Sequence, residues 1–116
     1  MRVQICVDGR EQLADLWALQ DWLAHEPELA DRVRPVAVPP AEGELGATEV
    51  LEAVLGGGGA LAALATSLKV WFAQPRRADV KIIIRRRDRS VELDAKRVAD
   101  VASVISALKS LDSDGD

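Results

Sequence analysis

The chain has 116 residues, a formal net charge of −4, and a composition that is 48% hydrophobic but only 3% aromatic. This length suits a single domain with a modest core of Leu, Val, Ile and Ala, and the negative charge excludes a nucleic-acid binder that acts by bulk electrostatics. A single cysteine, Cys6, excludes an internal disulfide, and the lack of a long apolar region near the N-terminus predicts no secretory signal and a cytoplasmic location.

The first third of the chain predicts a strand, a helix and a second strand. Apolar and polar residues alternate over residues 2–8, as in a half-buried strand. A helix is expected to begin at Asp8 and to end near residue 25. A second strand is expected over residues 33–38, and Pro35 favours an edge position for it because proline lacks the N–H that a ladder requires.

Two tryptophans stand on the apolar side of the expected first helix. Trp17 and Trp22 are five positions apart, so they do not share one narrow stripe. We expect one of them in the core and the other at a partner, and Trp22 is the candidate for the partner contact.

The longest apolar segment of the chain runs over residues 45–74, and its stretch 53–68 carries no charge. We expect a long helix here, interrupted by four consecutive glycines. Each glycine costs about 1 kcal/mol in a helix interior relative to alanine, so the run predicts close approach by another helix or subunit. The candidate residues for this self-association interface are the four glycines and three leucines at helical spacing: Gly56, Gly57, Gly58, Gly59, Leu61, Leu64 and Leu68.

Two other interpretations of this segment stay open. A membrane helix over residues 53–73 is one, although a span needs about 20 apolar residues and the uncharged run has 16. A dinucleotide fingerprint is the other, because Gly57, Gly59 and Ala62 match its spacing. That fingerprint requires a preceding strand, and the apolar residues of 49–55 have a helical period instead.

The last third predicts a hairpin and a helix. Strands are expected over residues 80–86 and 91–93, joined by a turn at 87–90. Asp94 is a candidate cap for a helix over residues 95–111. The expected order, β-α-β-α-β-β-α, indicates a two-layer α+β sandwich with a long central helix. It forms one domain over residues 1–111, followed by a disordered acidic tail over 112–116.

Apart from that dinucleotide fingerprint, no pattern in the sequence predicts a catalytic, cofactor or metal site. The only histidine, His25, stands at the end of the expected helix, where a solvated histidine is common. The chain has no Cys/His cluster for zinc and no Walker lysine after the glycines. We therefore expect no enzyme activity and no cofactor.

A basic hairpin is the best candidate for contact with an anion or an acidic partner. Its arginines are Arg85, Arg86, Arg87 and Arg89. No aromatic residue is interleaved to stack a base, which argues against nucleic acid as a partner. The alternative is a solvated turn.

Taken together, these segments resemble the effector-associated constant component family of actinobacterial conflict systems. The matching segments are RVQICVDG, LWALQDWLAHEPEL, RVRPV, GELGATEVLEAVLGGGGALAALATSLKVWF and VKIIIRRRDRSVELDA. The turn RDRS departs from the glycine-containing turn usual in the family.

The resemblance implies a small adaptor or scaffold of bacterial immunity, with no catalytic residues to carry over. Its implied partner is an effector protein encoded nearby, such as a caspase-like or trypsin-like peptidase. We also expect a homo-oligomer, and a membrane-associated component is the alternative.

Overall fold

The computed structural model describes residues 1–9, 11–38, 48–56, 59–75 and 79–112. The described elements follow the order β-α-β-β-α-β-β-α, with a short 3-10 helix, η2, before the last α-helix. Their bounds are β1 Arg2–Asp8, α1 Gln12–Ala24, β2 Val33–Val38, β3 Thr48–Val54, α2 Ala60–Phe72, β4 Lys81–Arg86, β5 Arg89–Leu93, η2 Arg97–Ala99 and α3 Val101–Asp112.

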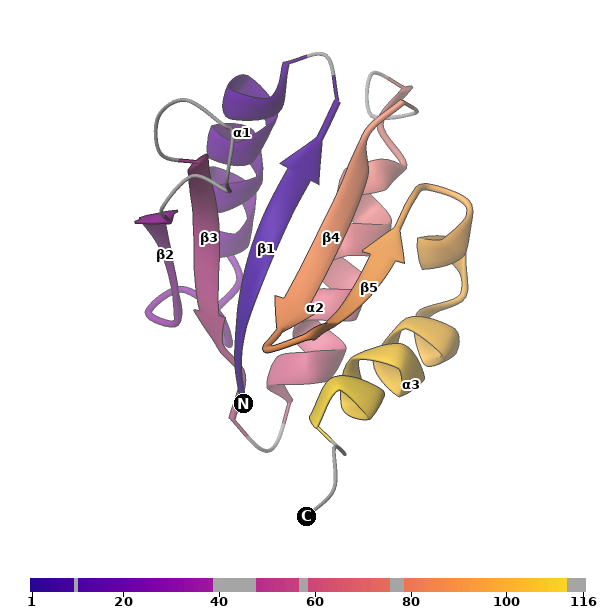
Figure 1. The fold of residues 1–116 in the computed structure, drawn as a ribbon. Coiled ribbons are helices and arrows are strands. Elements are labelled where there is room, and N and C mark those ends of the chain that lie inside the picture. The colour runs from indigo at the N-terminus through magenta and orange to yellow at the C-terminus, as the bar shows by residue number, and fades with distance from the viewer. Residues whose placement is uncertain (10, 39–47, 57–58, 76–78, 113–116) are drawn as a thin grey trace.

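One antiparallel sheet with strand order β2-β3-β1-β4-β5 forms the first layer (Figure 1). In the segment from β1 to β4, α1 connects β1 to β2 across β3, and α2 connects β3 to β4 across β1. These two split β-α-β units are the topology of ferredoxin-like domains. β5 and α3 extend the sheet and the helical layer on one side. Pro35 lies in β2, at the sheet edge, as predicted.

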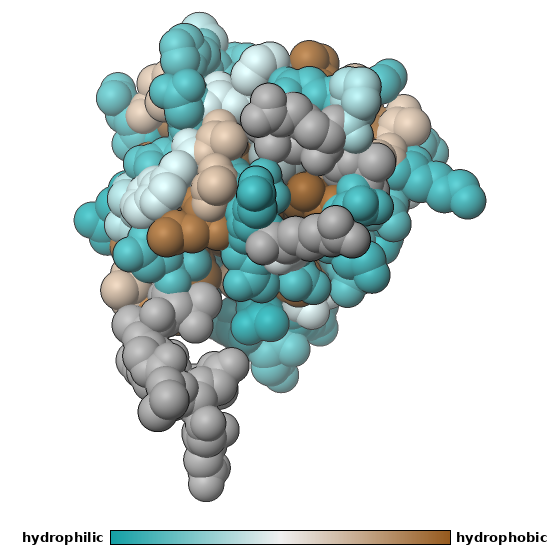
Figure 2. Space-filling view, turned by 90° about the horizontal axis from the view of Figure 1, so that it is seen from above, coloured by the Kyte–Doolittle hydropathy of each residue, from teal (hydrophilic) through white to brown (hydrophobic). Residues whose placement is uncertain are grey.

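The helices form the second layer and lie behind the sheet in Figure 1. Alternate side chains of a strand point to the same face of the sheet. In β1, the buried residues Val3, Ile5 and Val7 therefore share one face, and this face packs against the helices. The helices contribute buried residues that include Leu16, Leu19 and Leu23 of α1, Leu64, Leu68 and Trp71 of α2, and Val104 and Leu108 of α3. Seen from above, the coloured surface is mostly hydrophilic, with apolar residues in small groups (Figure 2).

The predicted long helix with internal glycines is not confirmed. Thr48–Val54 is the strand β3, which the expected order lacked, and α2 begins at Ala60 with Gly59 as its N-cap residue. Alternation was hard to see in the sequence because Val50 and Leu51 are both apolar and both buried, although they point to opposite faces. Gly57 and Gly58 lie outside the described residues.

The structure bears on both other interpretations of residues 45–74, the dinucleotide fingerprint and the membrane helix. The strand and helix that a dinucleotide fingerprint needs are present, but β3 pairs antiparallel with both neighbours, whereas that motif belongs to a parallel sheet. Among the described residues, no helix is both long and apolar enough to cross a membrane.

The predicted hairpin is confirmed and its turn is tight. Arg86 pairs with Arg89, so Arg87 and Asp88 form a two-residue loop. Arg87 has a φ of 59°, the left-handed region that glycine favours. Since Asp88 does not share the positive φ, the loop has the φ pattern of a type II′ turn.

The first and last helices begin later than predicted. Asp8 ends β1, and α1 starts at Gln12. The expected helix over residues 95–111 divides into η2 and α3, because the backbone of Asp100 is extended. Two carboxylates cap the two pieces: Asp94 Oδ1 accepts from the Arg97 N–H at 2.8 Å, and Asp100 Oδ1 from the Ser103 N–H at 3.3 Å. Asp112 belongs to α3, and the rest of the predicted acidic tail lies outside the described residues.

Candidate functional site

The face of the sheet opposite the helices carries a row of apolar side chains. Val36 pairs with Val50, and Cys6 pairs with Ile83. The β1–β3 register, in which Ile5 faces Leu51, brings Val50 alongside Cys6. We call Val36, Val50, Cys6 and Ile83 the apolar stripe. Val50 is buried and the other three are half-buried, although the three α-helices all pack on the other face of the sheet.

Ion pairs flank the apolar stripe on both sides. Arg34 donates from Nη2 and Nε to Oε1 of Glu52, at 2.9 and 3.1 Å. Lys81 Nζ lies 3.5 Å from Oε1 of Glu92. Exposed pairs of this kind contribute about 0–1 kcal/mol to folding. Their arrangement gives the face an apolar centre between charged margins, as in protein–protein interfaces.

Cys6 stands within the apolar stripe. Burial raises the pKa of its thiol, and the nearby positive charge of Arg85 offsets part of that increase. Since the thiolate is the nucleophilic form, a raised pKa leaves Cys6 mostly protonated and weakly reactive at neutral pH. Its chemistry therefore fits a packing role rather than nucleophilic catalysis.

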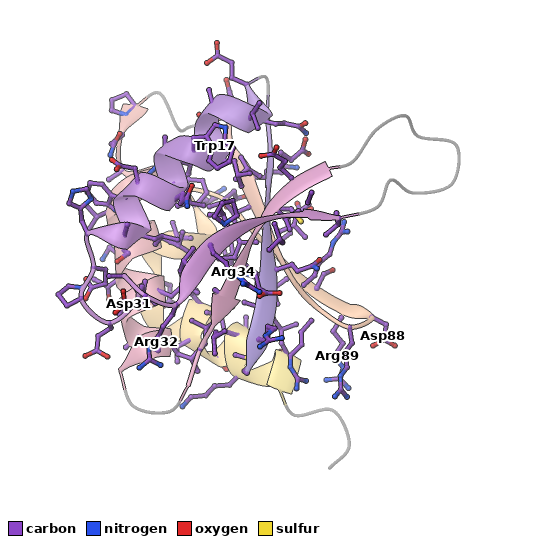
Figure 3. The ribbon with its side chains drawn as sticks, turned by 90° about the vertical axis from the view of Figure 1, so that its left-hand side faces the viewer. Trp17, Asp31, Arg32, Arg34, Asp88 and Arg89 are labelled. Carbon is purple, nitrogen blue, oxygen red and sulfur yellow. The ribbon has the colours of Figure 1, made fainter. Side chains whose placement is uncertain are left out.

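The described part of this face has no aromatic side chain. Trp71 and Phe72 lie in the core in an edge-to-face contact with ring centroids 5.2 Å apart. Trp17 is 41% exposed on α1, which belongs to the other layer (Figure 3). RNA-binding sheets of similar topology stack bases on aromatic residues, so the described face lacks that chemistry.

A group of arginines occupies one end of the same face. Arg34 and Arg85 belong to one row across the sheet, joined by Glu52 and Gln4. Arg2 faces Val54 in the next row, where Val54 N–H also donates to the Arg32 carbonyl at 2.9 Å. We call Arg2, Arg32, Arg34 and Arg85 the arginine surface.

A pocket opens at the β2 side of the arginine surface. Its volume is about 290 Å³, and it is lined by Arg2, Asp31, Arg32, Arg34, Glu52 and Val54. Figure 3 shows Asp31, Arg32 and Arg34 together along the start of β2. A Cβ on Gly56 would lie 3.2 Å from Nη1 of Arg32. Gly56 therefore leaves room for this guanidinium against the β3–α2 connection.

Three arginines of the predicted basic hairpin lie on different faces of the sheet. Arg85 points to the open face, whereas Arg86 Nη1 donates to the Leu111 carbonyl at 3.3 Å and Arg89 Nη1 to the Ser110 carbonyl at 2.9 Å. Those two carbonyls belong to the last turn of α3, whose carbonyl groups lack partners within the helix. Arg86 and Arg89 therefore cap α3.

A model of the family described as Effector Associated Constant Component 1 matches residues 8–112. The chain belongs to this family. Comparisons with curated proteins and with solved structures found no match. The description of Effector Associated Constant Component 1 points to association with an effector and names no reaction.

In this Effector Associated Constant Component 1 domain, two residues of the predicted interface on α2 belong to the core. Leu64 and Leu68 are fully buried in the domain's own core, and Leu61 is half-buried against it. Gly56 is half-buried and Gly59 is exposed. Leu64 and Leu68 are thus not available to a second copy in this fold.

Trp22 lines a shallow groove between α1 and α2. Its Nε1 donates to the Ser67 carbonyl at 3.0 Å, and the groove has a volume of about 570 Å³. The groove also contains His25, whose Nδ1 lies 2.7 Å from the Asp21 carbonyl at the exposed end of α1. The described residues contain no group of three His, Cys, Asp or Glu side chains placed to hold a metal ion.

Sequence reasoning missed the apolar stripe and most of the arginine surface. Arg2 and Arg34 occupy solvent-facing positions of two strands that were predicted, so the alternation alone marks them as outward. Their proximity depends on the sheet order, which places β3 between β1 and β2.

Proposed function

We propose that this protein is a non-enzymatic component of a bacterial conflict system that binds an effector protein on the open face of its sheet. The observation that carries the proposal is the apolar stripe, a row of apolar side chains on the face opposite the helices. Burial of apolar surface is the main driving force of protein association, at about 25 cal/mol per Å². Family membership supports the effector as the occupant of this face.

The identity of the effector follows from the resemblance and is part of the proposal. A caspase-like or trypsin-like peptidase encoded beside this gene is the first partner to test. In this role the chain is an adaptor that positions or restrains the peptidase and contributes no catalytic group. Self-association remains a prediction, and because Leu64 and Leu68 are core residues, its surface must lie outside this part of α2.

Replacing Ile83 by Glu tests the proposal. Ile83 is half-buried on the open face, and a glutamate there would place a charge within the apolar stripe. We expect affinity for the product of the neighbouring gene to fall by at least about 30-fold, which corresponds to 2 kcal/mol. Isothermal titration of the purified proteins gives the affinity, and the melting temperature verifies that the variant is folded.

Val70→Glu is the matched control. Val70 is 49% exposed on α2, in the helical layer, so the same chemical change there should leave effector binding within about twofold. If the Ile83 variant is folded and binds like the parent, the open face is not the effector site. If only the Val70 variant loses binding, the groove between α1 and α2 takes its place.

A further inference from the structure

We propose that the arginine surface binds an acidic polypeptide segment of the effector, whose carboxylates pair with Arg2, Arg32 and Arg85. This inference rests on the proposed function, because it assumes that a protein occupies the open face. It adds the chemistry of that protein: apolar side chains over the apolar stripe, and Asp or Glu side chains beside them.

The first support is that these guanidinium groups have no partner among the described residues. In the part of the chain that the structure describes, Arg2, Arg32 and Arg85 make no hydrogen bond or ion pair through their side chains. Arg34 directs Nε and Nη2 to a single oxygen of Glu52. An arginine guanidinium binds a carboxylate through two parallel N–H donors. The arginine surface therefore has guanidinium N–H groups available to bind carboxylates.

The second support is the local charge. The arginine surface brings together four guanidinium groups, and Asp31 and Glu52 are the carboxylates that line its pocket. Four positive and two negative charges give +2 in a chain whose net charge is −4. Arg2, Arg32 and Arg34 line one pocket, and like charges this close repel one another at physiological salt, where the screening length is about 8 Å. Carboxylates of a partner would relieve this repulsion.

The third support is the position of the arginines next to the apolar stripe. Arg34 and Arg85 lie in the row adjacent to Val36, Val50, Cys6 and Ile83. Neighbouring strands are about 4.8 Å apart, so the backbones at Arg34 and Arg85 are separated by roughly 14 Å across three strand intervals. An extended segment of about four or five residues covers that distance. One segment can therefore place apolar residues on the stripe and carboxylates on two or more arginines.

The lack of aromatic side chains on the described face favours a polypeptide over a nucleic acid. Single-stranded nucleic acids are bound by stacking on aromatic side chains as well as by basic grooves, and the described face has no aromatic residue.

The test uses three fluorescent probes with the full-length protein. The first is a twelve-residue peptide in which glutamates alternate with valine and serine, the second has glutamine in place of glutamate, and the third is a single-stranded oligonucleotide of equal charge. Fluorescence anisotropy is measured at about 0.05 and 0.3 M salt. We expect the glutamate peptide to bind, with an affinity that falls at least tenfold at the higher salt, and the glutamine peptide not to bind.

Replacing Arg2, Arg32 and Arg85 together by Gln should weaken binding of the glutamate peptide at least tenfold. The control removes the same charge elsewhere, by replacing Lys69, Lys96 and Lys109 by Gln, and should change binding by less than twofold. These lysines are exposed, in α2, before η2 and in α3. Equal losses in the two variants would reduce the effect to bulk charge and overturn the inference. Tighter binding of the oligonucleotide than of the peptide would overturn it as well.

The two proposals fail separately. If Ile83→Glu abolishes effector binding while the triple arginine variant binds the effector like the parent, the acidic-segment inference is wrong and the proposed function stands. If the peptide binds as expected but neither variant affects the effector, the arginine surface binds acidic peptides and the effector lies elsewhere.

Discussion

Leu68→Ala should lower the free energy of unfolding by about 2–5 kcal/mol. Leu68 is fully buried on α2 and belongs to the core between the sheet and the helices. Alanine would remove apolar contacts there and leave a cavity that the surrounding helices fill only partly. Because small domains are stable by about 5–15 kcal/mol, this one change removes a large share of the total. Urea denaturation followed by circular dichroism measures the effect.

Val70→Ala is the matched control on the same helix. Val70 is 49% exposed, so its truncation should change stability by no more than about 0.5 kcal/mol.

The two variants, Leu68→Ala and Val70→Ala, also test whether α2 is a core helix or an interface helix. A loss of association with unchanged monomer stability in Leu68→Ala would restore the self-association role that the apolar sequence of α2 first indicated.

Replacing Arg86 and Arg89 together by Gln should destabilise α3 by about 1–3 kcal/mol. Both arginines donate to carbonyls of its last turn, and both place a positive charge at the negative end of the helix dipole. Glutamine keeps part of the side-chain stem and loses the charge. Hydrogen exchange of the α3 amides should accelerate, because local opening becomes easier. We therefore expect Arg86 and Arg89 to contribute to the stability of α3.

Arg85→Gln provides the comparison, because Arg85 lies on the same hairpin and points to the open face. It should leave α3 exchange and the melting temperature close to those of the parent. A double Arg86 and Arg89 variant with parental exchange in α3 would show that the two hydrogen bonds do not hold the end of this helix.

The local elements with one apolar face could be predicted from the sequence. Alternation identified β1 and β5, β2 and β4 were also predicted as strands, and Pro35 placed β2 at an edge. β3 could not be predicted in this way. Its Val50 is apolar and buried on the face away from the helices, and Glu49 and Glu52 stand three apart as in a helix. An extended backbone is favoured there by pairing with strands on both sides, which is a long-range effect.

The site was harder to predict than the fold because it is assembled across strands. The run of hairpin arginines is obvious in the sequence, but alternation sends Arg85 to the open face and Arg86 and Arg89 toward α3. Arg2 and Arg32 are 30 positions apart in the chain and meet only because both lie beside Val54. Such proximity follows from sheet order and register, which local patterns do not contain.

Alkylation of Cys6 in the presence of the effector tests the central claim most directly. The sequence has one cysteine, and it lies in the apolar stripe, so a maleimide reports on the open face alone. Because burial raises the pKa of Cys6, the reaction is best followed at about pH 8, where more thiolate forms. The rate is measured by mass spectrometry with and without a saturating amount of the neighbouring gene's product, and binding is verified in the same sample.

We predict that the effector slows alkylation of Cys6 at least about tenfold, because the apolar stripe becomes buried in the complex. Ile83→Glu should abolish this protection, and Val70→Glu should retain it. An alkylation rate that is unchanged in a saturated complex would contradict the account, since it would leave the open face of the sheet unoccupied when the effector is bound.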